Sequence, residues 1–497
     1  MSLLTDKDFV EGLPSALDLF LMPPYQTSVF QHYYVDVRPV SQITDSSPVE
    51  FQISNSGSDY VDLKRSRLHV KLKVSHSDGT VLGKDEHVSP VNLFMQALWS
   101  QAAVYLQGQL VSSANSHYPY KAYIQTLLNY GAEAKETQLQ SQLFYKDIGE
   151  TQADIESTNP ITRTNSGLSS RGTFIADSKT VTMEGALCED IFNMGRYLVN
   201  GVDMTVKLFR SSSPFCLMSG KSRQQYKIDL QDIYFKICKL KINSALILTH
   251  NKLFENSNSL YPFTKTEVKM SSIPSSQQSY VWDSVFQSQC PNRLIVGFVN
   301  GDGVSGSYTK NPFNFQSSFV KTVALYLDGV SVPGRPVEAD DVSAYVNLFE
   351  GVGRWGQDGG NYIERVEFAL GSGLFVFNLD PVFLDSDYLS LLKNGNLSEI
   401  IQDVIAMSHE QMLAVVAIAK RLLDNHIPVT RSEQRSKTVH KKHKLELLKS
   451  HQFIIPACIL ALLAYLGDEN ETTYDEQTDD SLIEGNLSET FEESGGE

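Results

Sequence analysis

The feature that most constrains this chain is a strict alternation of apolar and polar side chains near its N-terminal quarter. Leu68, Val70, Leu72 and Val74 are each separated by one polar residue, so they fall on one side of an extended chain. A helix would instead repeat its apolar residues at a spacing of three or four. The alternation therefore predicts a strand over residues 60–74 with one buried face and one solvated face.

Short apolar runs with turn residues between them continue this pattern through residues 50–397. The further predicted strands are Tyr226–Ile237, Tyr234–Ile242, Leu294–Val299, Val323–Leu327 and Leu374–Leu379, and Val104–Val111 is predicted to be a hairpin. Gln107-Gly108 and Asp328-Gly329 predict tight hairpins, because glycine accepts the positive φ that such turns need. Tyr120–Tyr130 is the best helix candidate in this region.

Many short strands with few helices predict antiparallel sheets that form a sandwich or barrel. About 350 residues are too many for one eight-stranded sandwich, so two sandwiches are expected. The Ser- and Pro-containing stretch Ser211–Gln225 is the predicted joint, with a fresh strand pattern from Tyr226 onward.

After residue 397 the pattern changes. Residues 398–426 repeat apolar side chains at helical spacing, 431–449 are basic, 453–466 are apolar, and 468–497 are acidic. The final 30 residues contain twelve acids and no Lys or Arg, which predicts a disordered tail. This tail supplies most of the formal net charge of -16, so the body of the chain is only mildly acidic.

Composition excludes several classes of function. An acidic chain does not fit a whole-protein nucleic-acid binder, which normally carries a basic excess. The basic stretch 431–449 could still contact nucleic acid or act as a nuclear import signal, although a solvated helix face explains it better.

The apolar run 453–466 is shorter than the about 20 residues that span a bilayer, which favours a buried or interfacial segment over an anchor. The first residues lack a basic n-region, so no secretory signal is expected.

No motif predicts catalysis, a cofactor or a metal. Gly301-Asp-Gly303-Val-Ser-Gly306 resembles a dinucleotide fingerprint, but Pro312 and no helical period follow it, so a glycine-rich loop between strands is the better interpretation. His409-Glu410 lacks the second histidine of a zinc helix. The five cysteines are far apart and form no C-x-x-C pair. The chain is therefore expected not to be an enzyme, with no catalytic, cofactor-binding or metal-binding residues.

Ten short runs, taken in order over residues 50–397, resemble the major capsid (hexon-like) protein of Polinton/Maverick elements and adintoviruses. The runs are Tyr60-Val-Asp-Leu63; Val91-Asn-Leu93 with Leu98-Trp-Ser-Gln101; Val104-Tyr-Leu-Gln-Gly108; Tyr118-Pro-Tyr-Lys-Ala-Tyr123 with Leu127-Leu-Asn-Tyr130; Gly185-Ala-Leu187 with Asp190-Ile-Phe192; Tyr261-Pro-Phe263; Pro291-Asn-Arg293; Gly306-Ser-Tyr308; Asn311-Pro-Phe-Asn-Phe315; and Tyr326-Leu-Asp-Gly329. Each run alone is weak, and it is their shared order that makes the resemblance specific.

The resemblance implies a mainly β double jelly roll, that is, two tandem eight-stranded antiparallel sandwiches. The helical C-terminal extension and the disordered acidic tail, which the residues themselves predict, depart from the family. The resemblance further implies that Asn311–Phe315 inserts aromatic rings into a sandwich and that Tyr118–Tyr120 anchors the loop before a short helix. The expected organisation is an N-terminal arm at 1–49, a first jelly roll at 50–220, a second at 221–397, a helical and basic extension at 398–450, an apolar segment at 451–467 and the tail at 468–497. The two strands that close the second jelly roll in the family have no counterpart after Leu397.

The function implied is that of a structural capsid protein. Three copies would form a pseudo-hexagonal capsomer that contacts further copies and a minor penton protein, without a small-molecule substrate. The protein would sit in a virion if assembled and otherwise inside the cell, not secreted. The alternative is a decayed or host-adopted copy whose altered C-terminus makes it a non-enzymatic interaction protein.

Overall fold

The computed structural model describes residues 25–45, 47–112, 115–159, 164–221, 224–275, 277–286, 290–327 and 329–379. The predictions made for residues 398–426, 431–449, 453–466 and 468–497 lie outside the described residues, as does His409-Glu410.

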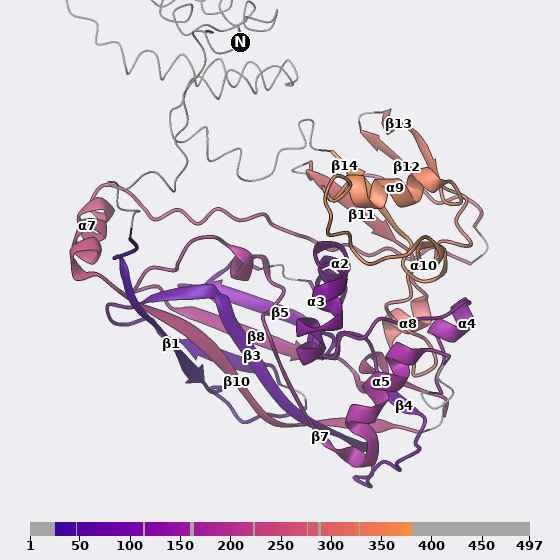
Figure 1. Ribbon diagram of the computed structural model, residues 1–497, viewed down its shortest axis with the longest axis horizontal. Coiled ribbons are helices and arrows are strands. Elements are labelled where there is room, and N and C mark those ends of the chain that lie inside the picture. The colour runs from indigo at the N-terminus through magenta and orange to yellow at the C-terminus, as the bar shows by residue number, and fades with distance from the viewer. Residues whose placement is uncertain are drawn as a thin grey trace, which may run out of the picture. The chain divides into compact units, whose positions relative to one another are not determined.

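The first sheet has four antiparallel strands in the order β1-β10-β3-β7 (Figure 1). Their bounds are β1 (Val29–Val37), β3 (Tyr60–His76), β7 (Thr180–Gly185) and β10 (Tyr226–Ile242). Leu68, Val70, Leu72 and Val74 of β3 are all fully buried, and the polar residues between them lie on the other face. The strand predicted from the period-two alternation is therefore confirmed.

The second sheet has the order β2-β8-β5-β6. Its strands are β2 (Val49–Ile53), β5 (Trp99–Leu106), β6 (Gln109–Leu110) and β8 (Met204–Arg210). Gln107 and Gly108 connect β5 to β6 with φ values of 47° and 78°. Two successive residues at positive φ match the twist of a two-residue hairpin, and the predicted hairpin is confirmed.

The two sheets face one another across a single hydrophobic core. Phe51 of β2 and Phe235 of β10 meet there with ring centroids 5.9 Å apart. Counted along the chain, the eight strands follow the order 1-8-3-6 in one sheet and 2-7-4-5 in the other. This is the strand order of a jelly roll, in which the last strand returns beside the first. We call this unit, Val29–Ile242, the sandwich.

The position of β10 moves the boundary expected from the sequence. β10 pairs with β1 from Val37↔Phe235 to Val29↔Ile242, and on its other side with β3. The sandwich therefore includes residues on both sides of the predicted range 50–220, and the strand expected to open a second sandwich closes the first. The stretch 211–225 has the composition of a loop, but loop composition does not reveal which distant strand the next segment will join.

Helices and short strands fill the ends and flanks of the sandwich. They are β4 (Val88–Pro90), α1 (Phe94–Ala97), α2 (Tyr118–Asn129), α3 (Ala132–Glu136), α4 (Gln152–Ile155), α5 (Ser166–Ile175), α6 (Ser213–Cys216), β9 (Leu217–Ser219), α7 (Ser244–Phe254) and the 3-10 segments Gln138–Gln142, Ala176–Ser178 and Asp190–Asn193. α2 confirms the helix predicted at 120–130. It begins two residues earlier, with Pro119 in its first turn, where a missing N–H costs nothing.

Residues 290–378, which we call the C-terminal part, contain two two-stranded sheets. β11 (Arg293–Gly297) pairs with β14 (Leu374–Asn378), and β12 (Thr322–Leu327) pairs with β13 (Val330–Glu338). Leu327 lies opposite Val330, so the hairpin predicted at this turn is confirmed. The helices here are α8 (Gly301–Ser305), α9 (Val342–Glu350) and α10 (Arg365–Leu370). A second eight-stranded jelly roll remains a prediction.

Candidate functional site: the junction around helix α2

The glycine-rich run 301–306 does not have the geometry of a nucleotide-binding turn. A five-residue helix, α8, begins at Gly301 and ends at Ser305, where the sequence had suggested only a loop. Asn300 caps it by accepting a hydrogen bond from the Asp302 N–H, at 2.9 Å. Gly306 has a φ of 98°, and the described residues 307–321 that follow it contain no helix. There is thus no helix N-terminus directly after the third glycine to receive a pyrophosphate.

Within the residues that the structure describes, no group of three or more His, Cys, Asp or Glu side chains is placed to hold a metal ion. Over the same residues, no helix has the length and apolar character needed to cross a membrane. A cluster of polar and charged side chains surrounds a small cavity where the C-terminal part meets α2.

Aromatic rings from both parts interlock at this junction. Phe313 and Phe315, from the loop after α8, are each 2% exposed. Phe313 stacks on Tyr123 of α2 with centroids 4.3 Å apart, and it meets Tyr120 edge-on at 5.7 Å. Phe215 of α6 also meets the Phe313 ring edge-on, with centroids 5.9 Å apart. The family resemblance implied that these aromatics insert into a sandwich, and here they pack against the helix that covers one.

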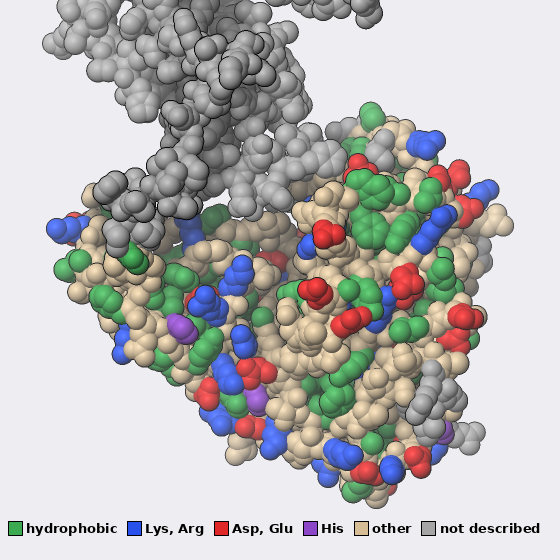
Figure 2. Space-filling view, viewed as in Figure 1, with side chains coloured by type: hydrophobic (Ala, Val, Ile, Leu, Met, Phe, Trp, Pro, Cys, Tyr) green, Lys and Arg blue, Asp and Glu red, His purple; other side chains and the backbone are tan. Residues whose placement is uncertain are grey.

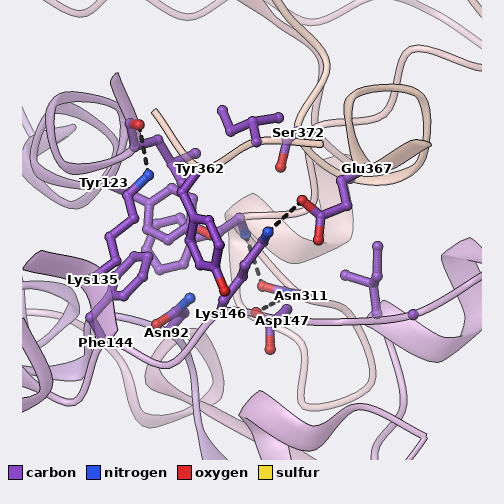
Figure 3. Close-up of a pocket in the computed structure, with 16 residues that line it drawn as sticks. Asn92, Tyr123, Lys135, Phe144, Lys146, Asp147, Asn311, Tyr362, Glu367 and Ser372 are labelled. Carbon is purple, nitrogen blue, oxygen red and sulfur yellow. Dashed lines mark hydrogen bonds and ion pairs between the residues drawn. The ribbon is translucent and has the colours of Figure 1, made fainter. Parts of the chain in front are cut away.

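A small cavity lies beside these rings, with charged side chains around it (Figure 3). Lys146 Nζ lies 2.7 Å from a carboxylate oxygen of Glu367 on α10 and 3.9 Å from the ring centroid of Tyr362. The Tyr362 hydroxyl donates to the carboxylate of Glu136 on α3, which raises the pKa of Tyr362 to about 12. The sandwich and the C-terminal part are thus joined by a chain of polar contacts.

Lys135 is the most perturbed base of the junction. Its side chain is 3% exposed, and its ammonium donates to the backbone oxygens of Leu127, at 2.8 Å, and Asn361, at 2.5 Å. Burial, followed by the nearby positive charge of Lys146, lowers the pKa of Lys135 to about 7. Leu127 lies in the last turn of α2, so this cation also satisfies a helix C-terminus.

A second cation supports the same helix end. Arg354, from the C-terminal part, donates to the backbone oxygen of Asn129 at 2.6 Å. Cations are favourable at a helix C-terminus because the last carbonyls have no partner within the helix. The end of α2 is therefore completed by residues that are distant in sequence.

The cavity is too small for a substrate. Its volume of about 30 Å³ leaves room for only a few water molecules. Its charged groups have protein partners: Lys146 pairs with Glu367, and Asp147 accepts from Arg171 at 2.6 Å. The arrangement can stabilise a joint between the sandwich and the C-terminal part.

A buried charge cluster lies toward the other end of α2. Lys121 Nζ lies 2.8 Å from Glu189 and 3.0 Å from Asp190, and these side chains are between 3% and 9% exposed. Burial is the main cause that raises the pKa of Glu189 to about 7, and Asp190 adds to it while Lys121 opposes it. We call these three residues the buried triad.

Sequence reasoning found the elements of this junction but not its contacts. The aromatic loop and α2 were both singled out, whereas Lys121, Lys135 and Glu189 resembled ordinary surface charges. The only local signal was the position of Lys121 between Tyr120 and Tyr123 in a helix that is apolar on most sides.

Comparisons with known proteins give the following similarities. No protein-family model matches the chain. An uncharacterized protein of Caenorhabditis elegans is 26% identical over 398 residues, which cover 76% of this chain and 90% of the relative. Among solved structures, the capsid of PBCV-1 virus is similar with 9% identity and a TM-score of 0.42, covering 72% of this chain and 80% of that one. The mavirus major capsid protein is similar with 15% identity and a TM-score of 0.28, covering 49% of this chain and 54% of that one.

Proposed function

We propose that this chain is a structural subunit of a protein shell, a major capsid protein. The observation that carries the proposal is the strand order of the sandwich, in which β10 returns between β1 and β3 while β8 lies between β2 and β5. This jelly-roll order is widespread among viral capsid domains. Lectin and cupin domains share this strand order, so the fold alone does not assign a function. The ordered capsid-like runs of the sequence favour a capsid protein over these other jelly-roll proteins.

The same runs support an origin in a Polinton/Maverick-like element. In the structure several of them are buried determinants of the fold: Tyr118 and Tyr120 are 2% and 4% exposed, and Phe313 and Phe315 are 2% each. None of these residues brings nucleophile, base and cavity together. Residues that serve packing rather than catalysis are what a structural subunit needs.

Self-association is supported by the exposed apolar surface of the C-terminal part. Figure 2 shows hydrophobic side chains at the surface near β12 and α9. The large apolar residues exposed in this part are Phe319, Tyr326, Val330, Val342, Trp355 and Val366, between 46% and 67%. A contiguous patch of exposed apolar side chains often marks a protein–protein contact, whereas single exposed apolar residues are ordinary. We assign this surface to contacts between copies within a trimer and, beyond it, a shell.

In a shell the first partner is another copy, followed by a minor penton protein at the vertices. Residues 431–449 would be free to meet nucleic acid on the inner side. Within the proposal the protein belongs to the virion after assembly and is intracellular before it. The second jelly roll, expected at 221–397, would begin after Ile242 rather than at 221, because β10 is a strand of the first sandwich.

Light scattering on the purified full chain tests the proposal. A discrete species of three chain masses supports it, and a strict monomer at every salt concentration contradicts it. The double variant Tyr326→Asp with Val330→Asp places charge on the apolar surface and should lower the trimer fraction by at least tenfold. Val81→Asp, at a residue 58% exposed on the sandwich, is the matched control and should leave the trimer intact.

A host-adopted interaction protein is the second candidate, and one observation favours it. No residue of β11 or β12 is fully buried, although both strands are apolar. A sandwich closed by further strands would bury such residues, so this face is open in the described chain. Trimers that never form shells with a minor partner would favour this candidate over the capsid.

A further inference from the structure

A long segment without helix or strand crosses the sandwich between α7 and β11. We call residues 258–273 the strap. Figure 1 shows it running from α7 toward α2. Tyr261, Phe263, Val268 and Met270 of the strap pack partly buried against the core, while Lys265 and Lys269 are exposed. The strap is thus a shallow cover rather than a part of either sheet.

Side chains of the sandwich, rather than a neighbouring strand, tether the strap. Arg196 donates to the Leu260 oxygen at 2.6 Å, and Asn115 donates to the Val268 oxygen at 2.5 Å. Between these two points, the Thr266 N–H donates to Asp190 Oδ2 at 2.7 Å. Asp190 belongs to the buried triad, so the middle of the strap is bound to a buried carboxylate.

The triad carries more negative than positive charge when both acids are ionised. One ammonium, Lys121, then faces Glu189 and Asp190 with almost no solvent. A net charge buried without water is costly, whereas one proton on the acid pair makes the cluster neutral. The strap belongs to neither sheet and is held by hydrogen bonds with the side chains of Arg196, Asn115 and Asp190, so it can move away without breaking a strand ladder.

We propose that the strap is a proton-controlled cover, docked on the sandwich while the Glu189–Asp190 pair holds one proton and lifted when that proton is lost. Lifting frees the Thr266 N–H and lets water reach both carboxylates. The Lys121 ammonium then neutralises one of them without leaving the other unsolvated.

The groups that face Glu189 are consistent with this mechanism. From α2 these are Lys121 and Tyr118, and burial holds the pKa of Tyr118 well above its usual range, so it stays neutral. On its own segment they are Asp190 and Cys188, and burial raises the pKa of the Cys188 thiol to about 12. The strap contributes Thr266, which does not titrate and whose N–H donates to Asp190, the neighbour of Glu189. Of the groups whose pKa burial raises here, Glu189 is the one whose pKa lies near neutrality.

The sign follows from the raised pKa of Glu189, about 7 when docked against an ordinary value of 4.5. The docked state binds the proton more tightly than the lifted state, so docking is favoured at low pH and weakens as pH rises through 7. Taking the ordinary value for the lifted state, the lifting equilibrium constant increases about tenfold between pH 6 and pH 8.

Hydrogen exchange on the full chain, with rates divided by the intrinsic rate at each pH, measures this equilibrium. Protection of the strap amides should fall about tenfold from pH 6 to pH 8, while β3 amides keep their protection. In Glu189→Gln, which mimics the protonated acid, strap protection should change less than twofold. Glu184→Gln, on the outer face of β7, is the matched control and should keep the tenfold change.

A second variant separates the strap from the stability of the triad. Thr266→Pro removes the N–H donor and should expose the strap at both pH values, with the sandwich still folded by circular dichroism. Equal strap protection at pH 6 and pH 8 in the unsubstituted chain would overturn the proposal, as would a tenfold change that survives in Glu189→Gln. These results do not depend on whether the chain assembles into a shell.

Discussion

The ring of Phe313 lies parallel to the ring of Tyr123, with centroids 4.3 Å apart and an angle of 10° between the planes. Tyr123 belongs to α2 of the sandwich, and Phe313 belongs to the loop after α8 in the C-terminal part. The two residues are 190 positions apart in the sequence, and their contact fastens one part of the chain to the other.

Phe313→Ala should therefore uncouple the two parts. Removing a buried phenylalanine costs about 3–5 kcal/mol, from lost transfer energy and the cavity left behind. Urea unfolding followed by tyrosine fluorescence and by circular dichroism should show one transition in the unsubstituted chain and two in the variant. Phe319→Ala is the control, since Phe319 is 64% exposed and should change the free energy of unfolding by less than about 0.5 kcal/mol. If the Phe313→Ala protein unfolds in one transition at an unchanged urea midpoint, the Phe313–Tyr123 contact does not couple the two parts.

The lowered pKa of Lys135 makes stability depend on pH above neutrality. Its folded value of about 7 lies below the ordinary 10.5, so the unfolded chain binds the extra proton between these values. The free energy of unfolding should thus increase from pH 7 to pH 9, by on the order of 2 kcal/mol. Lys135→Met should lose this increase, and Lys179→Met, at an exposed lysine, should retain it. Parallel pH profiles for both variants would contradict the assignment.

Much of the fold could be predicted from local pattern, because local pattern records which face of a segment is buried. The alternation at Leu68–Val74, the turn at Gln107-Gly108 and the helix near Tyr120 are all such cases. Pairing between distant segments has no local signature. Tyr226–Ile242 was recognised as strand, yet nothing in its residues indicates that its partners are β1 and β3 rather than later strands.

The candidate site was less predictable for the same reason. Lys121 meets Glu189 across 68 positions, and Lys135 meets Asn361 across 226. In the sequence, Lys121, Glu189 and Lys135 look like ordinary charged residues, and only the fold shows that they are buried. The aromatic loop Asn311–Phe315 could be singled out through its resemblance to the capsid family, whereas a charge reveals its burial only through its partners.

Removal of Lys121 should be severe. Lys121→Met leaves two buried carboxylates without their cation, and breaking such a pair costs about 3–5 kcal/mol. Adding Glu189→Gln removes one of the two charges and should recover at least about 1 kcal/mol in urea unfolding at pH 8. Additive losses in the double variant would show that the three side chains do not act as one cluster.

Gly167 of α5 should not tolerate any side chain. A Cβ at this position would lie 2.1 Å from the backbone oxygen of Lys146, and backbone cannot move aside cheaply. Gly167→Ala should lower the free energy of unfolding by about 1–3 kcal/mol, as overpacking typically does. At Gly195 a Cβ meets nothing within 4 Å, so Gly195→Ala is the control and should be near neutral. Equal thermal midpoints for the two variants would mean that α5 does not pack here as described.

The most direct test of the central claim is electron microscopy of the purified full-length chain, with images averaged without imposed symmetry. A capsid subunit predicts three-fold particles with a pseudo-hexagonal outline, each copy contributing the β1-β10-β3-β7 and β2-β8-β5-β6 sheets. Single sandwiches without a symmetry axis, at every protein concentration tried, would contradict it.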